Sequence, residues 1–290
     1  MESKRQRPEV APLDPRVVGL IRTLAGEYAD KYASEYVLGH LGKLLSVAEP
    51  DRDSIANALE DPINSLVAYF GHYAFARRGK DREALAKLSV AALKQVVSQL
   101  GARSILGAEH GQPLWEEFAR QCEQKGRKIH ELQDRGPVQG VLELAQEIER
   151  ISPGDSIATW VEDTVLTTGQ LEPIYARIVD IRGVGPKNAS TFLRDICWIF
   201  DIEKDIIPQD RLVIQPIDRW MRQIVPYVVP EQDLKDPADW VIAGKVSKYV
   251  RRAGVSEIAF NMGVTYFGQS VARSPERLAP ALRELVIPGA

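Results

Sequence analysis

The chain has 290 residues, of which 44% are hydrophobic and 27% are charged, so it can bury a sizeable core. Its net charge of −3 excludes attraction to nucleic acids or membranes by the charge of the whole surface, and any such contact must come from a local basic face. The two cysteines, Cys122 and Cys197, exclude a four-thiolate zinc or iron–sulfur site and fit a reducing compartment. The N-terminus has no apolar signal segment, and no run of 18 apolar residues occurs, so we expect a cytoplasmic protein without contact to a membrane.

Apolar residues recur at helical spacing from the N-terminus onward. Two separate amphipathic helices are expected near residues 17–28 and 37–45, and Asp53 or Ser54 is expected to cap a short third helix. The segment DPINSLVAYF begins another helix, with Asp61 as its cap and Pro62 in its first turn. A basic loop follows, and a long helix then ends at Gly101.

Residues 101–113 and the polar stretch KGRKIHELQDRGP are expected to be connections. The later helical patterns lie at 114–122, 141–148, 157–161, 171–179, 189–200, 218–227, 240–252, 256–267 and 275–285. LVIQPI is the one candidate strand, and it is short. The sequence therefore predicts an all-α fold.

The segment RGVGPK, residues 182–187, joins two of these helices by a tight turn. Gly183 and Gly185 permit backbone angles denied to other residues, and Val184 can fill the space between the helices. Pro186 suits the first turn of a helix. The turn thus presents backbone amides at a helix N-terminus, where the helix dipole favours a DNA phosphate. The alternative is a purely structural turn.

Lys187 lies just inside the second helix, where the helix dipole and the expected partial burial disfavour a charged amine. A neutral amine is a nucleophile suited to C1′ of a sugar, and a lysine that binds phosphate is the alternative. Asp218, in the segment PIDRW, precedes an amphipathic helix and is a candidate cap for it. Its carboxylate can also stabilise positive charge at a sugar carbon or accept a proton from an amine, and the two roles are compatible.

GVGPK followed by PIDRW resembles the helix-hairpin-helix/Gly-Pro-Asp superfamily of DNA glycosylases, and DPINSLVAYF is similar to the helix that opens the helical barrel of that family. The likeness covers most of residues 61–270, and its specific parts are the hairpin and the aspartate segment. The interval from Lys187 to Asp218 is longer than in most members and is similar to that of the archaeal-type 8-oxoguanine glycosylases. Trp220 stands where many members have histidine.

The resemblance implies two helical lobes, with the helix-hairpin-helix motif at the cleft between them and a flipped-out base in that cleft. Residues 1–60 would pack with residues 201–290 as one lobe, and residues 61–200 would form a helical barrel that ends in the hairpin at 171–200. Lys187 matches the Schiff-base nucleophile of those members that also cut the DNA backbone, and Asp218 matches the catalytic aspartate.

The resemblance implies a bifunctional DNA glycosylase and AP lyase that acts on double-stranded DNA with a modified base. The modified base that the resemblance implies is 8-oxoguanine. We expect no metal or other cofactor, because the iron–sulfur cysteines of some members are missing here, and we take a monomer as the default. Two alternatives stay open. One is excision of another base, such as an alkylated purine or a bulky modified cytosine of foreign DNA. The other is a DNA-binding protein that grips phosphates without catalysis.

Further candidate residues surround this pair. The candidate DNA contacts in the hairpin and the basic loop are Arg182, Gly183, Val184, Gly185, Arg77, Arg78 and Lys80. The candidate lining of the base pocket is Tyr69, His72, Trp220, Phe260, Met262 and Phe267. The alternative for the basic loop is a solvated loop, and the alternative for the pocket residues is packing in the core.

Overall fold

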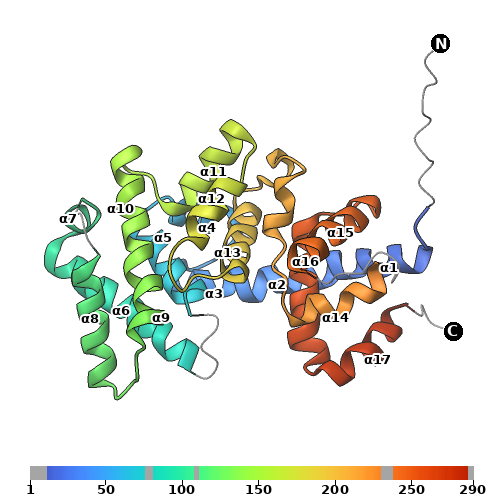
Figure 1. The fold of residues 1–290 in the computed structure, drawn as a ribbon, viewed down its shortest axis with the longest axis horizontal. Coiled ribbons are helices and arrows are strands. Elements are labelled where there is room, and N and C mark those ends of the chain that lie inside the picture. The colour runs from blue at the N-terminus through green and yellow to red at the C-terminus, as the bar shows by residue number, and fades with distance from the viewer. Residues whose placement is uncertain (1–11, 76–80, 108–110, 230–237, 287–290) are drawn as a thin grey trace, which may run out of the picture.

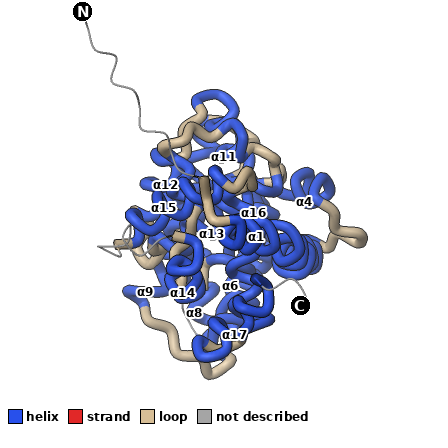
Figure 2. Tube along the Cα trace, turned by 90° about the vertical axis from the view of Figure 1, so that its right-hand side faces the viewer, coloured by secondary structure: helices blue, strands red, loops and turns tan. Residues whose placement is uncertain are grey.

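All regular structure in the computed structural model is helical over the residues that it describes, which are 12–75, 81–107, 111–229 and 238–286 (Figures 1 and 2). The predicted all-α class is confirmed. LVIQPI does not form a strand: η7 (Asp210–Ile214) is a 3₁₀ helix, followed by an irregular stretch up to Asp218. With no second strand to pair with in the described residues, the segment bonds partly within itself, since the Gln215 N–H donates to the Leu212 carbonyl at 3.2 Å.

The first helical run is continuous from Pro15 to Leu45, where the sequence predicted two separate helices. Its five parts are α1 (Pro15–Thr23), η1 (Leu24–Tyr28), α2 (Ala29–Tyr32), η2 (Ala33–Leu38) and α3 (Gly39–Leu45). η1 and η2 are π-helical turns, which are wider than α-helical ones. Such turns shift the phase of the buried stripe, which explains why the 3.6-residue spacing lapses in the sequence although the chain stays helical.

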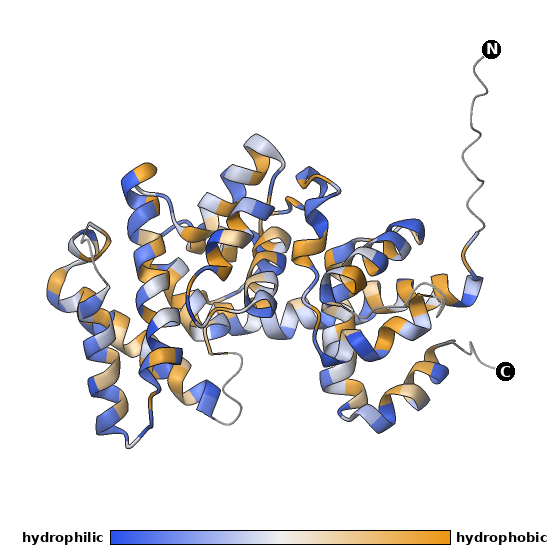
Figure 3. Ribbon diagram, in the orientation of Figure 1, coloured by the Kyte–Doolittle hydropathy of each residue, from blue (hydrophilic) through white to orange (hydrophobic). Residues whose placement is uncertain are grey.

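A first hydrophobic core gathers most of the helices that follow. All of the following helices except α9 contribute side chains to it: α4 (Arg52–Leu59), α5 (Pro62–Ala68), η3 (Tyr69–Tyr73), α6 (Arg82–Leu100), α7 (Ala102–Leu106), α8 (Gln112–Gln124), α9 (Glu131–Arg135), η5 (Gly136–Gly140), α10 (Val141–Ile151), α11 (Ile157–Thr168), α12 (Glu172–Val179) and α13 (Pro186–Ile199). Hydrophobic and hydrophilic residues alternate along them, as an amphipathic packing requires (Figure 3). Two segments predicted as connections contain α7, α9 and η5.

The ends of these helices follow the capping rules, with one change from the prediction. Asp61 caps α5 by accepting a hydrogen bond from the Asn64 N–H at 2.8 Å, and Pro62 opens the helix, as predicted. Gly101 ends α6 with φ +82°, also as predicted. The cap of α4 is Asp51, where the sequence predicted Asp53 or Ser54. The Asp51 carboxylate accepts from the Ser54 N–H, and the Ser54 hydroxyl oxygen accepts from the Asp51 N–H.

A second core lies toward the C-terminus and includes side chains of residues 20–28. Its helices are α14 (Arg219–Val228), α15 (Asp239–Arg252), α16 (Glu257–Tyr266), η9 (Phe267–Ala272) and α17 (Pro275–Val286), and the short η6 (Glu203–Asp205) precedes them. Helix α16 serves both cores, because Ile258 and Met262 pack into the first and Phe260 and Val264 into the second. In both views α16 lies near the middle of the molecule beside α13 (Figures 1 and 2).

The N-terminal run is divided between the two cores. Side chains of residues 20–28 pack into the second core, whereas side chains between Ala29 and Leu59 pack into the first, together with those of residues 61–200. The predicted lobes, 1–60 with 201–290 and 61–200, stay a prediction. None of the described helices combines the length and apolarity that a bilayer crossing demands.

Candidate active site

A tight turn joins α12 to α13 and contains the glycine-rich segment. The Val184 N–H donates to the Ile181 carbonyl at 2.9 Å, and Val184 is buried as the sequence predicted. Gly183 has φ +88°, the left-handed region that favours glycine. Gly185 has φ −96° and ψ 167°, an extended conformation open to any residue, so the prediction of an unusual backbone angle is right for Gly183 and wrong for Gly185.

The turn rests on η5. A Cβ atom added to Gly136 would lie 1.7 Å from the Arg182 carbonyl oxygen, and one added to Gly183 would lie 2.7 Å from the Gln133 carbonyl oxygen. The missing side chains therefore let two backbones approach closely, which is a second reason for a glycine at 183. Residues 133–137, which the sequence predicted to lie in a connection, thus supply the surface that supports the turn.

The first residues of the turn and of α13 keep hydrogen-bonding capacity for a ligand. The amides of Gly183 and Gly185 donate no backbone hydrogen bond within the part of the chain that the structure describes. Gly183 is exposed and Gly185 is buried. An exposed free amide next to a helix N-terminus attracts an anion.

Lys187 and Asp218 line one cavity of about 630 Å³, here named the lysine–aspartate pocket. Its walls come from the first helical run, η3, the start of α6, α13, the stretch before α14, and the adjoining ends of α16 and η9. Much of the lining is aromatic and comes from Tyr32, Tyr36, His40, His72 and Tyr73. The pocket therefore offers both polar groups and ring surfaces to a ligand.

Lys187 is exposed at this pocket, where the sequence predicted partial burial. Its side-chain amine has no partner among the described residues, and only its backbone carbonyl is engaged, by the Thr191 hydroxyl at 2.8 Å. Asp218 is half-buried and caps α14, as predicted: its Oδ1 accepts from the Trp220 and Met221 N–H groups, both at 2.9 Å. Within the described ranges Lys187 and Asp218 form no ion pair with each other, so a ligand can approach both groups.

Arg194 adds a buried charge to the same pocket, and sequence reasoning missed it. It lies two turns after Lys187 on α13, is 1% exposed, and pairs with Asp195 at 2.7 Å. Its guanidinium also donates to the Tyr32 hydroxyl and, at 2.7 Å, to Asn261 Oδ1. The available signal was an Arg–Asp pair inside the apolar stripe of a helix, since buried charges occur there only when paired.

His72 is the one predicted base-pocket residue that lines the lysine–aspartate pocket. Its ring packs edge-to-face against His40, with centroids 4.8 Å apart. Burial lowers the pKa of His72 well below its usual value, and the positive charges of His40, Arg82 and Arg194 act in the same direction. The imidazole is therefore neutral at pH 7.

The other five predicted pocket residues do not line this pocket. Tyr69, Trp220, Phe260, Met262 and Phe267 are each at most 2% exposed and belong to the two cores. Core packing, the alternative stated for them, is where the structure places them. An aromatic residue at helical spacing gives the same pattern in a core and in a pocket, so the sequence alone does not separate the two.

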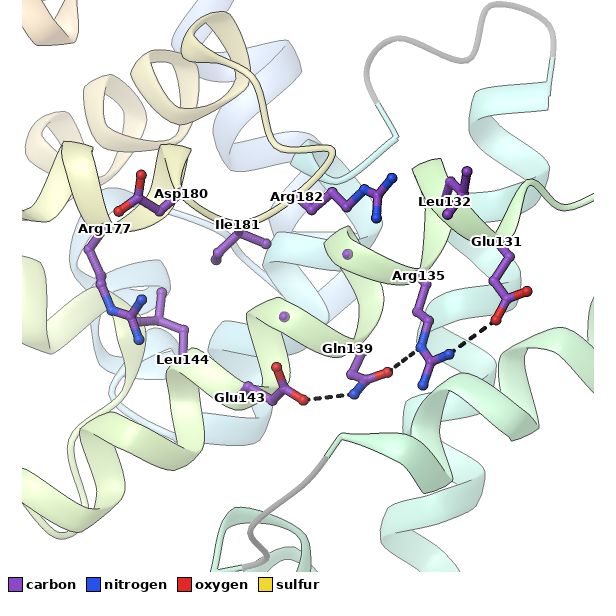
Figure 4. Close-up of a pocket in the computed structure, with 12 residues that line it drawn as sticks. Glu131, Leu132, Arg135, Gln139, Glu143, Leu144, Arg177, Asp180, Ile181 and Arg182 are labelled. Carbon is purple, nitrogen blue, oxygen red and sulfur yellow. Dashed lines mark hydrogen bonds and ion pairs between the residues drawn. The ribbon is translucent and has the colours of Figure 1, made fainter.

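Of the predicted DNA contacts in the turn, Val184 and Gly185 are buried, so only Arg182 and Gly183 are exposed to a partner. Arg77, Arg78 and Lys80 lie outside the described residues. Arg182 is exposed, has no partner among the residues that are described, and lines a second cavity of about 550 Å³ (Figure 4). Hydrogen bonds link Glu131, Arg135, Gln139 and Glu143 to one another below Arg182 in this view.

No group of His, Cys, Asp or Glu side chains in the described ranges has an arrangement that holds a metal ion.

Comparison of the chain with models of protein families, with curated proteins and with solved structures gives no significant match. The functional argument therefore depends on the lysine–aspartate pocket and the turn beside it.

Proposed function

We propose that this protein is a bifunctional DNA glycosylase and AP lyase of the helix-hairpin-helix/Gly-Pro-Asp superfamily. One observation carries the proposal: Lys187 and Asp218, remote in sequence, line one pocket and leave their reactive groups unpaired with each other. The likeness of GVGPK and PIDRW to the family motifs supports it. In this proposal α12, the turn and α13 are the helix-hairpin-helix motif at the cleft between two helical lobes.

The partner is double-stranded DNA with a modified base. A glycosidic bond is inaccessible inside a stacked duplex, so the nucleotide rotates out into the lysine–aspartate pocket. The exposed amide of Gly183 and the unpaired guanidinium of Arg182 bind backbone phosphates beside it. The enzyme acts as a monomer in the cytoplasm. We propose 8-oxoguanine as the base, and the similarity of the interval from Lys187 to Asp218 supports this choice.

The chemistry begins at C1′ of the flipped nucleotide. The Lys187 amine donates its lone pair to C1′ while the bond from C1′ to the base breaks, and the base leaves with that electron pair and a proton from the amine. Asp218 stabilises the positive charge that develops on the sugar and helps to remove the proton. Opening of the sugar ring then gives an imine between Lys187 and C1′.

Strand cleavage follows from the imine. Loss of a proton from C2′ expels the 3′ phosphate together with the electron pair of the C3′–O bond, and water later releases the lysine. The protein needs no cofactor for either step, because the imine itself withdraws the electrons that elimination requires.

Borohydride trapping tests this function directly, because reduction of the imine joins protein and DNA covalently. We expect wild-type protein to give an adduct with a duplex that contains 8-oxoguanine, and Lys187→Gln to give none. Lys204→Gln, at an exposed lysine of η6, is the matched control and should trap like the wild type. An adduct only with duplexes that carry another modified base would reassign the substrate. No adduct with any duplex would favour a glycosylase without lyase activity or DNA binding without catalysis.

A further inference from the structure

A chain of buried polar side chains links the lysine-bearing helix to the stretch before the aspartate. Arg194 Nη1 on α13 donates to Asn261 Oδ1 on α16 at 2.7 Å. Asn261 Nδ2 donates in turn to Gln215 Oε1 at 3.2 Å and to the Pro216 carbonyl at 3.4 Å. Arg194, Asn261 and Gln215, here named the Arg194–Gln215 chain, are each at most 2% exposed.

The ends of this chain lie close to the two reactive groups in the sequence. Arg194 is on the same face of α13 as Lys187, seven residues later, and both line the pocket. Pro216 also lines the pocket and lies two residues before Asp218. The stretch from Gln215 to Asp218 is not helical, so hydrogen bonds from its neighbours are needed to fix its path.

The side-chain amide of Gln215 makes a second hydrogen bond, because its Nε2 donates to the Glu257 carbonyl at 3.2 Å. Asn261 and Glu257 both belong to α16, the helix that packs into both cores. The aspartate-bearing stretch is therefore tied to α16, and α16 is tied to the lysine-bearing helix through a charge-assisted hydrogen bond, the strongest kind in this chain.

We infer that Asn261 is a positioning residue that fixes the Asp218 carboxylate relative to the Lys187 amine. This inference rests on the proposed function. Burying amide groups costs desolvation energy that an apolar side chain of the same volume would not cost. We therefore explain the polar side chains by the positions that their hydrogen bonds fix rather than by a gain in stability. Catalysis by two separate groups depends on such geometry, and a misplacement of about 1 Å reduces a rate by about 100-fold.

Two variants interrupt the chain at different bonds. Asn261→Asp keeps the acceptor for Arg194 and removes the N–H donor to Gln215 and Pro216. Gln215→Leu removes the acceptor for Asn261 and leaves the Arg194–Asn261 bond in place. Gln146→Leu is the matched control, because Gln146 is a similarly buried amide that donates to the Ile105 carbonyl at 2.8 Å and does not line the pocket.

The assay is single-turnover cleavage of a duplex that contains one abasic site, made by removing uracil, so that recognition of a base plays no part. We expect both chain variants to cleave roughly 10- to 100-fold more slowly at saturating protein, with the half-saturating protein concentration within about twofold of the wild-type value. Gln146→Leu should cleave at the wild-type rate. Circular dichroism measures the folded fraction, and Gln215→Leu decides the question if Asn261→Asp does not fold.

Folded chain variants that cleave at the wild-type rate would overturn the inference, and so would a loss confined to DNA affinity. The proposed function fails in a different way: wild-type protein would not cleave the abasic duplex, or Lys187→Gln would cleave it as fast as the wild type.

Discussion

Replacement of Gly136 by alanine tests whether η5 supports the turn. Gly136 has the helical angles φ −56° and ψ −54°, so alanine fits its backbone, and any loss of stability from the change is steric. The new Cβ would lie 1.7 Å from the Arg182 carbonyl oxygen, although real Cβ contacts stay above 3.0 Å. The turn and η5 must therefore separate by about 1.3 Å or more, an overpacking that typically costs about 1–3 kcal/mol.

Gly244→Ala is the matched control, because Gly244 is inside α15 and a Cβ there meets nothing within 4 Å. Alanine is favoured over glycine in a helix by up to about 1 kcal/mol, so this variant should be slightly more stable than the wild type. Urea unfolding should therefore shift in opposite directions for the two variants.

The DNA-binding consequence of Gly136→Ala follows from the same displacement. Moving the turn displaces Arg182 and the Gly183 amide together, so fluorescence anisotropy with a labelled duplex should report affinity weakened several-fold for Gly136→Ala alone. Equal stability and equal DNA affinity of Gly136→Ala and Gly244→Ala would refute the supporting role of η5.

Three further predictions concern charges. Asp218→Asn should keep the cap of α14, so the variant should remain within about 0.5 kcal/mol of wild-type stability and bind DNA, but it should lose most turnover. Asp61→Asn, at the cap of α5, is the matched control. Full activity of Asp218→Asn would mean that Asp218 acts only as a helix cap. The pKa of His72 is lowered in the folded protein, so below about pH 6.5 the unfolded chain binds a proton that the folded protein does not. The free energy of unfolding therefore falls as the pH falls, by at most about 1.4 kcal/mol per pH unit. His72→Gln should flatten the fall in unfolding free energy between pH 7 and 5, and an unchanged slope would contradict this. Arg182→Ala should lower DNA affinity at low salt and reduce the salt slope by about 1, whereas Arg103→Ala should leave both unchanged.

Local rules predicted much of the fold. Apolar periodicity indicated the all-α class, and the caps of α5 and α6 followed from Asp61, Pro62 and Gly101, because these features depend on residues near in sequence. The same rules missed the continuity of the first helical run, because η1 and η2 change the period on which the prediction relied.

The site was only partly predictable. The segments GVGPK and PIDRW drew attention to Lys187 and Asp218, and the structure brings both to one pocket. The partners of Arg194 come from α2 and α16, and the support for Gly183 comes from residues next to η5. These contacts join residues far apart in the sequence, so only tertiary packing reveals them.

The most direct test of the account is to identify the amine that bonds to the sugar. Wild-type protein trapped with borohydride on an abasic duplex can be digested and its DNA-linked peptide sequenced by mass spectrometry. The account predicts a single modified residue, Lys187. A link at the N-terminal amine or at another lysine would contradict it.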